Sequence, residues 1–172
     1  MNRIAIIFVV IFTMIGIGVK AQRRINYSVK AEIGHLKFQN LTIDIDPGPN
    51  WKGYHLSGKN GFDINIVNGI SYKKIFVGIG LGYLNFEGTN GLSIFSDIEY
   101  LPLNTKLTPL INLKIGYSHI WNQYEKGRGT AMGEFGLGLN YRLSGKVSIF
   151  IKSGFLKTQQ SLLIPIKLGF RF

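Results

Sequence analysis

The feature that most constrains the fold is a strict alternation of apolar and polar residues near the end of the chain. From Ile164 to Phe172 every second residue is large and apolar, and the intervening positions include Lys167 and Arg171. Successive side chains of a β-strand point to opposite faces, so this period of two predicts a strand with one apolar and one polar face. Helical spacing is almost absent after residue 25. The sequence therefore predicts an all-β fold.

The same alternation defines seven earlier segments, each long enough to cross a bilayer when tilted. They are expected at Asn26–Phe38, Gly61–Tyr72, Ile75–Phe86, Leu92–Leu101, Leu107–Ile120, Ala131–Leu143 and Val147–Leu156. With the last segment they make eight. An even number of strands places the start of the first strand and the end of the last strand on the same, periplasmic side of the membrane. We expect an eight-stranded antiparallel up-and-down β-barrel.

The expected connections differ in length between the two ends of this barrel. Those at one end are short: Lys73–Lys74, Pro102–Lys106 and Ser144–Lys146. Those at the other end are longer, with two long connections at Gln39–Asn60 and Trp121–Thr130 and two moderate ones at Glu87–Gly91 and Lys157–Leu162. Short turns at one end and longer loops at the other are typical of barrels that span a membrane.

The two faces of the strands distinguish a membrane barrel from a soluble one. Between the expected membrane boundaries the apolar face carries no charged residue and only Asn68, Ser96 and Ser153 as polar residues. The opposite face carries Lys30, Glu32, Asp63, Asp97, Glu99, Lys114, Glu134, Lys152, Lys167 and Arg171, with Arg142 just beyond. Inside a narrow membrane barrel these charges can pair, while inward glycines leave room for long side chains. A soluble lipocalin-like barrel, with the apolar face inside, is the alternative.

Two rows of aromatic residues on the apolar face favour the membrane barrel. One row lies at the short-turn end, with Tyr27, Tyr72, Tyr100, Tyr141 and Phe172. The other lies toward the loop end, with Phe62, Tyr83, Tyr117, Phe135 and Phe155. Ten residues separate Phe62 from Tyr72, which at ~3.3 Å per residue and ~40° tilt is ~25 Å, the height of an apolar belt between aromatic girdles.

The beginning of the chain has the layout of a secretory signal peptide. Arg3 precedes an apolar run from Ile4 to Val19, and Ala21 precedes the expected cleavage. We therefore expect a signal peptide at residues 1–21 and a barrel domain at 22–172. The net charge of +11 comes partly from bases expected at the short-turn end. Export and this distribution argue against nucleic-acid binding.

The closing Leu168-Gly169-Phe170-Arg171-Phe172 and the run Gly78-Ile79-Gly80-Leu81-Gly82-Tyr83 carry a family resemblance. The chain resembles the small outer-membrane β-barrel proteins of Gram-negative bacteria, with the OmpA/OmpX-like shape, and the outer-membrane β-barrel domain family common in Bacteroidetes. The resemblance implies an outer-membrane location, contact with outer-membrane lipid and a monomer. It also implies that the barrel-assembly machinery recognises Phe170 and Phe172. It passes on no catalytic motif.

The candidate binding residues lie in the first long connection, where Asp44 and Asp46 precede a Pro-Gly turn and Trp51 and Tyr54 follow it. Two carboxylates are too few for a Ca²⁺ site, so we expect no metal and no cofactor. Alternation continues to Ile45, which would give a protein partner, extracellular or periplasmic, an edge for strand addition. We expect a non-catalytic barrel with a structural or surface-interaction role.

Three alternatives remain open. A narrow solute channel would need a continuous wet interior through the barrel. A lipid-modifying hydrolase would need an outward serine, such as Ser96 or Ser153, beside His119 and an acid. A soluble lipocalin-like binder would enclose a small hydrophobe behind the apolar face.

Overall fold

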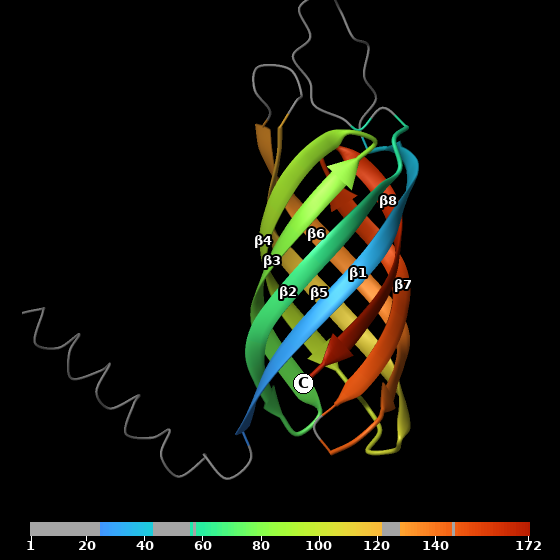
Figure 1. The fold of residues 1–172 in the computed structure, drawn as a ribbon. Coiled ribbons are helices and arrows are strands. Elements are labelled where there is room, and N and C mark those ends of the chain that lie inside the picture. Colours follow the sequence, from blue (N-terminus) through green and yellow to red (C-terminus); the bar gives the residue numbers. More distant parts are fainter. Residues whose placement is uncertain (1–24, 43–55, 57, 122–127, 146) are drawn as a thin grey trace, which may run out of the picture.

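The computed structural model describes residues 25–42, 56, 58–121, 128–145 and 147–172. The expected signal peptide lies outside these residues. The described chain forms one closed barrel in which every strand pairs antiparallel with its neighbours in sequence, and β1 pairs with β8 to close it (Figure 1). The strands form the wall of the barrel and are tilted steeply relative to its axis. The predicted all-β, eight-stranded antiparallel barrel is confirmed.

The strands cover most of the described chain. They are β1 (Ile25–Leu41), β2 (Gly61–Tyr72), β3 (Ile75–Phe86), β4 (Thr89–Tyr100), β5 (Leu107–Ile120), β6 (Arg128–Arg142), β7 (Ser148–Thr158) and β8 (Ser161–Arg171). The bounds of β2, β3 and β5 are those predicted. We call the end with the β2–β3, β4–β5 and β6–β7 connections the turn end, and the opposite end the loop end.

Two connections at the loop end are shorter than predicted. Only Glu87 and Gly88 join β3 to β4, and only Gln159 and Gln160 join β7 to β8. Glu87, Gln159 and Gln160 adopt positive φ values of 47°, 49° and 53°. This backbone matches the twist of a tight hairpin but usually calls for Asn or Gly, so the glutamines gave no turn signal. The expectation of moderate loops at 87–91 and 157–162 was wrong.

Strand β1 runs farther than predicted because its two neighbours end at different heights. It pairs with β2 only as far as Leu36, but with β8 as far as Leu41. A register shift lies between Phe38 and Asn40. On the side where β2 has ended, the amide of Phe38 donates to the side-chain oxygen of Asn60, 3.0 Å away.

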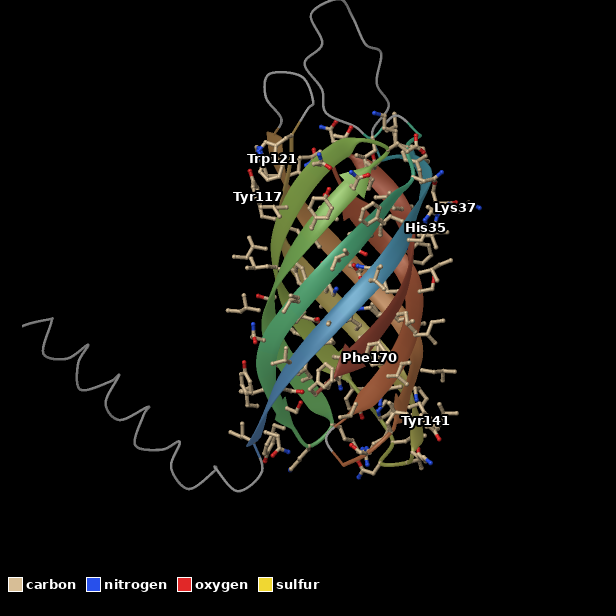
Figure 2. The ribbon with its side chains drawn as sticks, in the orientation of Figure 1. His35, Lys37, Tyr117, Trp121, Tyr141 and Phe170 are labelled. Atoms are coloured by element: carbon tan, nitrogen blue, oxygen red, sulfur yellow. The ribbon has the colours of Figure 1, made fainter. Side chains whose placement is uncertain are left out.

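The outer surface of the barrel is apolar and carries both aromatic rows. All ten aromatic residues of the two rows are exposed, from 37% for Tyr83 to 71% for Tyr27. Figure 2 shows Tyr117 and Trp121 near the loop end and Tyr141 and Phe170 toward the turn end. The large residues between the rows are exposed as well, including Ile66, Ile79 and Leu81. Among the described residues no helix is long and apolar enough to cross a membrane.

The interior is filled in three layers. The loop end holds an apolar layer in which no residue is more than 6% exposed: Leu36, Leu56, Leu84, Phe86, Ile120, Met132, Leu156 and Leu163. The middle holds the charged residues, and Phe76 and Phe150 lie toward the turn end. Leu56 comes from the β1–β2 connection, and its amide donates to the hydroxyl of Ser161, 3.2 Å away. The alternation in the sequence predicted the charged layer but not the apolar one.

Candidate functional site

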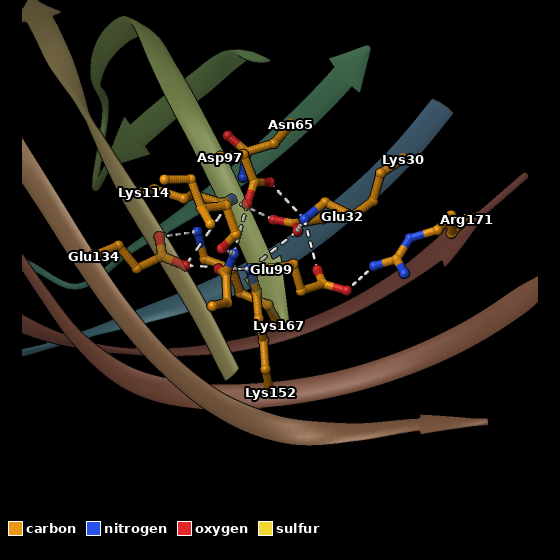
Figure 3. A network of polar contacts seen from close by, with 12 residues as sticks. Lys30, Glu32, Asn65, Asp97, Glu99, Lys114, Glu134, Lys152, Lys167 and Arg171 are labelled. Atoms are coloured by element: carbon orange, nitrogen blue, oxygen red, sulfur yellow. Dashed lines mark hydrogen bonds and ion pairs between the residues drawn. The ribbon is translucent and has the colours of Figure 1, made fainter. Parts of the chain in front are cut away.

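The ten charged residues predicted to face inward are all buried in the barrel. They come from every strand except β3: Lys30 and Glu32 (β1), Asp63 (β2), Asp97 and Glu99 (β4), Lys114 (β5), Glu134 (β6), Lys152 (β7), and Lys167 and Arg171 (β8). Figure 3 shows these side chains, with Asp63 unlabelled, converging in one network of polar contacts, which Asp63 joins through Lys167. Arg142, at the end of β6, is exposed and outside it.

Glu32 is the centre of the network because three lysines share its carboxylate. Its Oε1 lies 3.0 Å from Nζ of Lys30 and 3.0 Å from Nζ of Lys152. Its Oε2 pairs with Lys114. These lysines reach Glu32 from β5 and β7 as well as from β1 itself, so a single carboxylate ties distant parts of the wall together across the lumen.

Glu134 forms a second centre toward the loop end. Its Oε2 lies 2.6 Å from Nζ of Lys167, and its Oε1 lies 3.5 Å from Lys152 and 3.9 Å from Lys114. Lys167 also pairs with Asp63. Two lysines, Lys114 and Lys152, therefore contact both carboxylate centres and make the network continuous.

The network extends toward the turn end through Lys30. Its Nζ lies 2.5 Å from Asp97 and 3.0 Å from Glu99, and Glu99 also pairs with Arg171. Lys30 and Arg171 lie over the ring of Phe76 at 5.3 Å and 5.2 Å. Aromatic faces attract cations, so Phe76 supports the positive charges that the carboxylates do not fully surround.

The buried charges balance, with five acids facing five bases. Balance matters because moving ions out of water is expensive, and only close pairing with further hydrogen bonds offsets that cost. Asparagines supply such bonds: Asn112 donates to Asp97 at 2.5 Å and Asn65 donates to Asp63 at 2.8 Å. Asn112 also accepts a hydrogen bond from Lys152. The network is a neutral, cross-linked core built from polar groups.

Glycines create the space that these side chains occupy. A Cβ on Gly34 would lie 2.6 Å from Cγ of Lys167 and would press on the Asp63 carboxylate. Strand β3 supplies no charge but lines the interior with Gly78, Gly80 and Gly82. A Cβ on Gly80 would meet the ring of Phe95, over which the ammonium of Lys114 lies at 4.6 Å.

The remaining predicted site residues divide into two groups. Asp44, Asp46, Trp51 and Tyr54 lie outside the described residues. Phe170 and Phe172 are exposed on the outer face, at 43% and 58%. The main chain of Phe172 is bound to Val29 in both directions, at 3.1 Å and 2.9 Å, so the last strand stays paired with β1 to its final residue.

The outward serines and His119 do not assemble into a catalytic set. His119 on β5 lies opposite Gly129 of β6, whereas Ser153 on β7 lies opposite Leu137 of β6. Their two partners on β6 are eight residues apart, which is about 26 Å along the strand at ~3.3 Å per residue. Ser96 lies opposite Ile115, four residues below His119. His119 instead packs edge-on against Trp121. In the described part of the chain no group of three His, Cys, Asp or Glu residues is arranged to hold a metal ion.

The closed antiparallel barrel, its apolar outer face and its charged interior define a transmembrane β-barrel. The fold is similar to that of Neisserial surface protein A, at a TM-score of 0.63 and 13% identity, covering 86% of this chain and 97% of that one. It is also similar to the N-terminal β-barrel domain of Pseudomonas aeruginosa OprF, at a TM-score of 0.54 and 14% identity, covering 84% and 97%. At these identities the likeness concerns the fold alone. No protein-family model matches the chain, and no curated protein matches its sequence.

Proposed function

We propose that this chain is a non-catalytic integral protein of the outer membrane, with a closed barrel as a structural support and a surface-interaction role at its loop end. The observation that carries the proposal is the inverted composition of the wall. Residues such as Ile79 and Leu81 are each 65% exposed, while all ten network charges are buried. Such a surface is stable against lipid and would be a liability in water.

The filled interior favours a structural role over a channel. Eight strands enclose a lumen just wide enough to be filled by side chains. Here the middle layer is cross-linked by ion pairs, and the loop end is closed by apolar residues such as Phe86, Leu156 and Leu163. A dry apolar layer interrupts the continuous wet path that a solute would need.

The surface-interaction role rests on the lengths of the connections at the loop end. The β3–β4 and β7–β8 turns are tight, which leaves the β1–β2 and β5–β6 connections. The β1–β2 connection is the longer of the two, and it holds Asp44, Asp46, Trp51 and Tyr54, so it is the main candidate for contact with a partner. Strand β1 supports this, because among the described residues its ladder beyond Leu36 pairs with β8 only. On its other edge the Phe38 amide is bound to the Asn60 side chain, and we propose that an extended segment of a protein partner adds to the main-chain groups that follow it.

Cysteine labelling in intact cells tests the location and the orientation together. The chain has no cysteine, so single variants report unambiguously. We expect Gln39→Cys, exposed at the loop end, to react with a membrane-impermeant maleimide in intact cells. Asn104→Cys, exposed at the turn end, should react only after the outer membrane is permeabilised. Equal labelling of both variants in intact cells, or of neither, would contradict the proposal.

A further inference from the structure

The turn end contains a cavity of about 140 Å³ that the charge network does not use. At ~30 Å³ per liquid water molecule, this volume has room for a small hydrated ion. It opens among the ends of β2, β6, β7 and β8 and the β2–β3 turn. Its polar lining comes from Ser71, Lys73, Asn140, Arg142, Ser144, Ser148 and Arg171. Three of these seven side chains are cationic and none is acidic.

The Arg171 guanidinium is the most informative part of this lining. Arg171 is 8% exposed, and it pairs with Glu99 on the side of the network. Its Nε, although buried, has no hydrogen-bond acceptor among the described residues. Buried donors are almost always satisfied, so an orphaned one beside a cavity points to an acceptor that enters from outside the chain. Oxygen atoms of an anion are such acceptors.

The electrostatic environment of the cavity also favours an anion. Lys74, Lys106 and Arg142 lie at the same end of the barrel, and no described carboxylate side chain is exposed there. The carboxylate beneath the cavity, Glu99, is shared between Lys30 and Arg171. A main-chain oxygen of Phe172 accepts hydrogen bonds from Val29 and Ser28, at 3.1 Å and 2.8 Å. The Arg171 charge is balanced by Glu99, so the net positive charge at this end comes from the exposed bases around the cavity, such as Arg142.

The β2–β3 turn adds a further observation. Lys73 adopts a φ of 53° in a two-residue hairpin turn, where Gly or Asn is usually favoured. Its ammonium lies 5.2 Å from the ring centroid of Tyr72, so Lys73 lines the cavity without being one of its charged ligands.

We propose that this cavity binds a phosphate group, with Arg142 and Arg171 as its charged ligands and the hydroxyls of Ser71 and Ser148 as neutral donors. Phosphate fits because its several oxygens can accept from two guanidinium groups and from hydroxyls at once. The Asn140 amide can present its Nδ2 donor to the same space. The phosphate group belongs either to a phospholipid headgroup or to a soluble phosphate. The site goes beyond the proposed function and does not depend on it.

Calorimetry on the purified full chain in a phosphate-free maltoside detergent tests the site. One arm titrates inorganic phosphate. The second arm titrates maltoside micelles doped with phosphatidylglycerol, with diacylglycerol of the same chains as the phosphate-free control. We expect saturable one-to-one binding in at least one arm. Saturation by inorganic phosphate identifies a soluble source, and saturation by phosphatidylglycerol alone identifies a lipid source.

Matched variants separate a built site from diffuse surface charge. Arg142→Gln should weaken binding about tenfold, because a hydrogen bond to a charged group is lost. Lys106→Gln removes the same charge at the same end but outside the cavity, where Lys106 lies over the ring of Tyr141. It should change binding less than twofold. Ser148→Ala, which leaves the net charge unchanged, should weaken binding severalfold and provides a second test if Arg142→Gln does not fold. The absence of saturable binding in both arms, or equal weakening by Arg142→Gln and Lys106→Gln, would overturn the proposal.

Discussion

Individual residues decide whether this interior is stable, and Glu32 matters most among them. It serves three lysines at once, so its loss leaves Lys30, Lys114 and Lys152 buried with too little negative charge. Removing one partner from a buried ion network is far costlier than removing a surface charge. The stability of the barrel should therefore depend more on carboxylates that several lysines share, such as Glu32, than on the total number of ion pairs.

We expect Glu32→Gln to lower the free energy of unfolding by about 3–5 kcal/mol. Glu87→Gln, at the exposed β3–β4 turn, is the matched control and should change it by less than about 0.5 kcal/mol. Urea-induced unfolding in phosphatidylcholine vesicles, followed by tryptophan fluorescence, measures both. Similar small losses in the two variants would mean that the network is not a stabilising core.

A second residue-scale prediction concerns the space that glycines leave. Gly34→Ala would press a methyl group against Lys167 and Asp63, and should cost about 1–3 kcal/mol of stability. Gly133→Ala has open space around its Cβ and should be neutral or stabilising by up to about 1 kcal/mol. The same unfolding measurement compares them, and equal effects would show that the interior around Lys167 is loosely packed.

At the scale of elements, the strands were predictable and two of their connections were not. The bounds of β2, β3 and β5 follow from alternation that stops at recognisable breakers, such as Gly61 and the Lys73–Lys74 pair. The β7–β8 turn has no such signal, because Gln159 and Gln160 hold a conformation that usually calls for Asn or Gly. Gln159 is suited to the turn by its long side chain, whose amide lies 3.4 Å from the main-chain oxygen of Ser118.

The candidate site was predictable only in part, for a geometric reason. Alternation identifies the inward face, and hence which charges lie inside. Which base meets which acid depends on the stagger of the strands around the barrel, which brings Glu32 of β1 against Lys114 of β5 across the lumen. The apolar layer at the loop end was harder to predict. Leu36, Leu84 and Leu156 are apolar residues on the inward face, so the strands there have no apolar–polar alternation to mark the interior.

The β7–β8 turn yields the element-scale prediction. Gln160→Gly relieves a left-handed backbone conformation at a residue whose side-chain Oε1 is buried without a partner in the described chain. Stability should be unchanged or raised by up to about 1 kcal/mol. Gln159→Gly gains the same relief but loses the buried amide that bonds to Ser118, so it should be destabilised by about 1–2 kcal/mol. Thermal unfolding in detergent compares the two variants, and a reversed order would contradict this account of the turn.

On the scale of the whole molecule, the barrel places a neutral polar core inside an apolar surface. Such an arrangement is stable when lipid replaces water outside and the interior is filled. The structure meets the second condition, since the network residues are buried, and its exposed apolar surface requires the first. The loops and turns can then vary without disturbing the wall.

The filled interior predicts an electrically silent protein. Purified full-length chain inserted into a planar bilayer should give no discrete conductance steps, because the ion-pair layer and the apolar layer above it close the lumen. Insertion is verified separately by protease protection of the reconstituted chain. Regular, reproducible steps would support the solute-channel alternative.

The most direct test of the central claim, that this chain is a membrane-spanning barrel with its apolar face outward, is heat-modifiable migration in fractionated cells. Cells expressing the full chain are separated into outer-membrane and soluble periplasmic fractions, and each is run on SDS gels with and without boiling. A membrane-spanning barrel should give a band in the outer-membrane fraction that migrates differently in the two lanes. A band in the soluble fraction with unchanged migration would contradict the membrane-spanning barrel. It would mean that the apolar face points inward and lines a core that binds a small hydrophobic ligand.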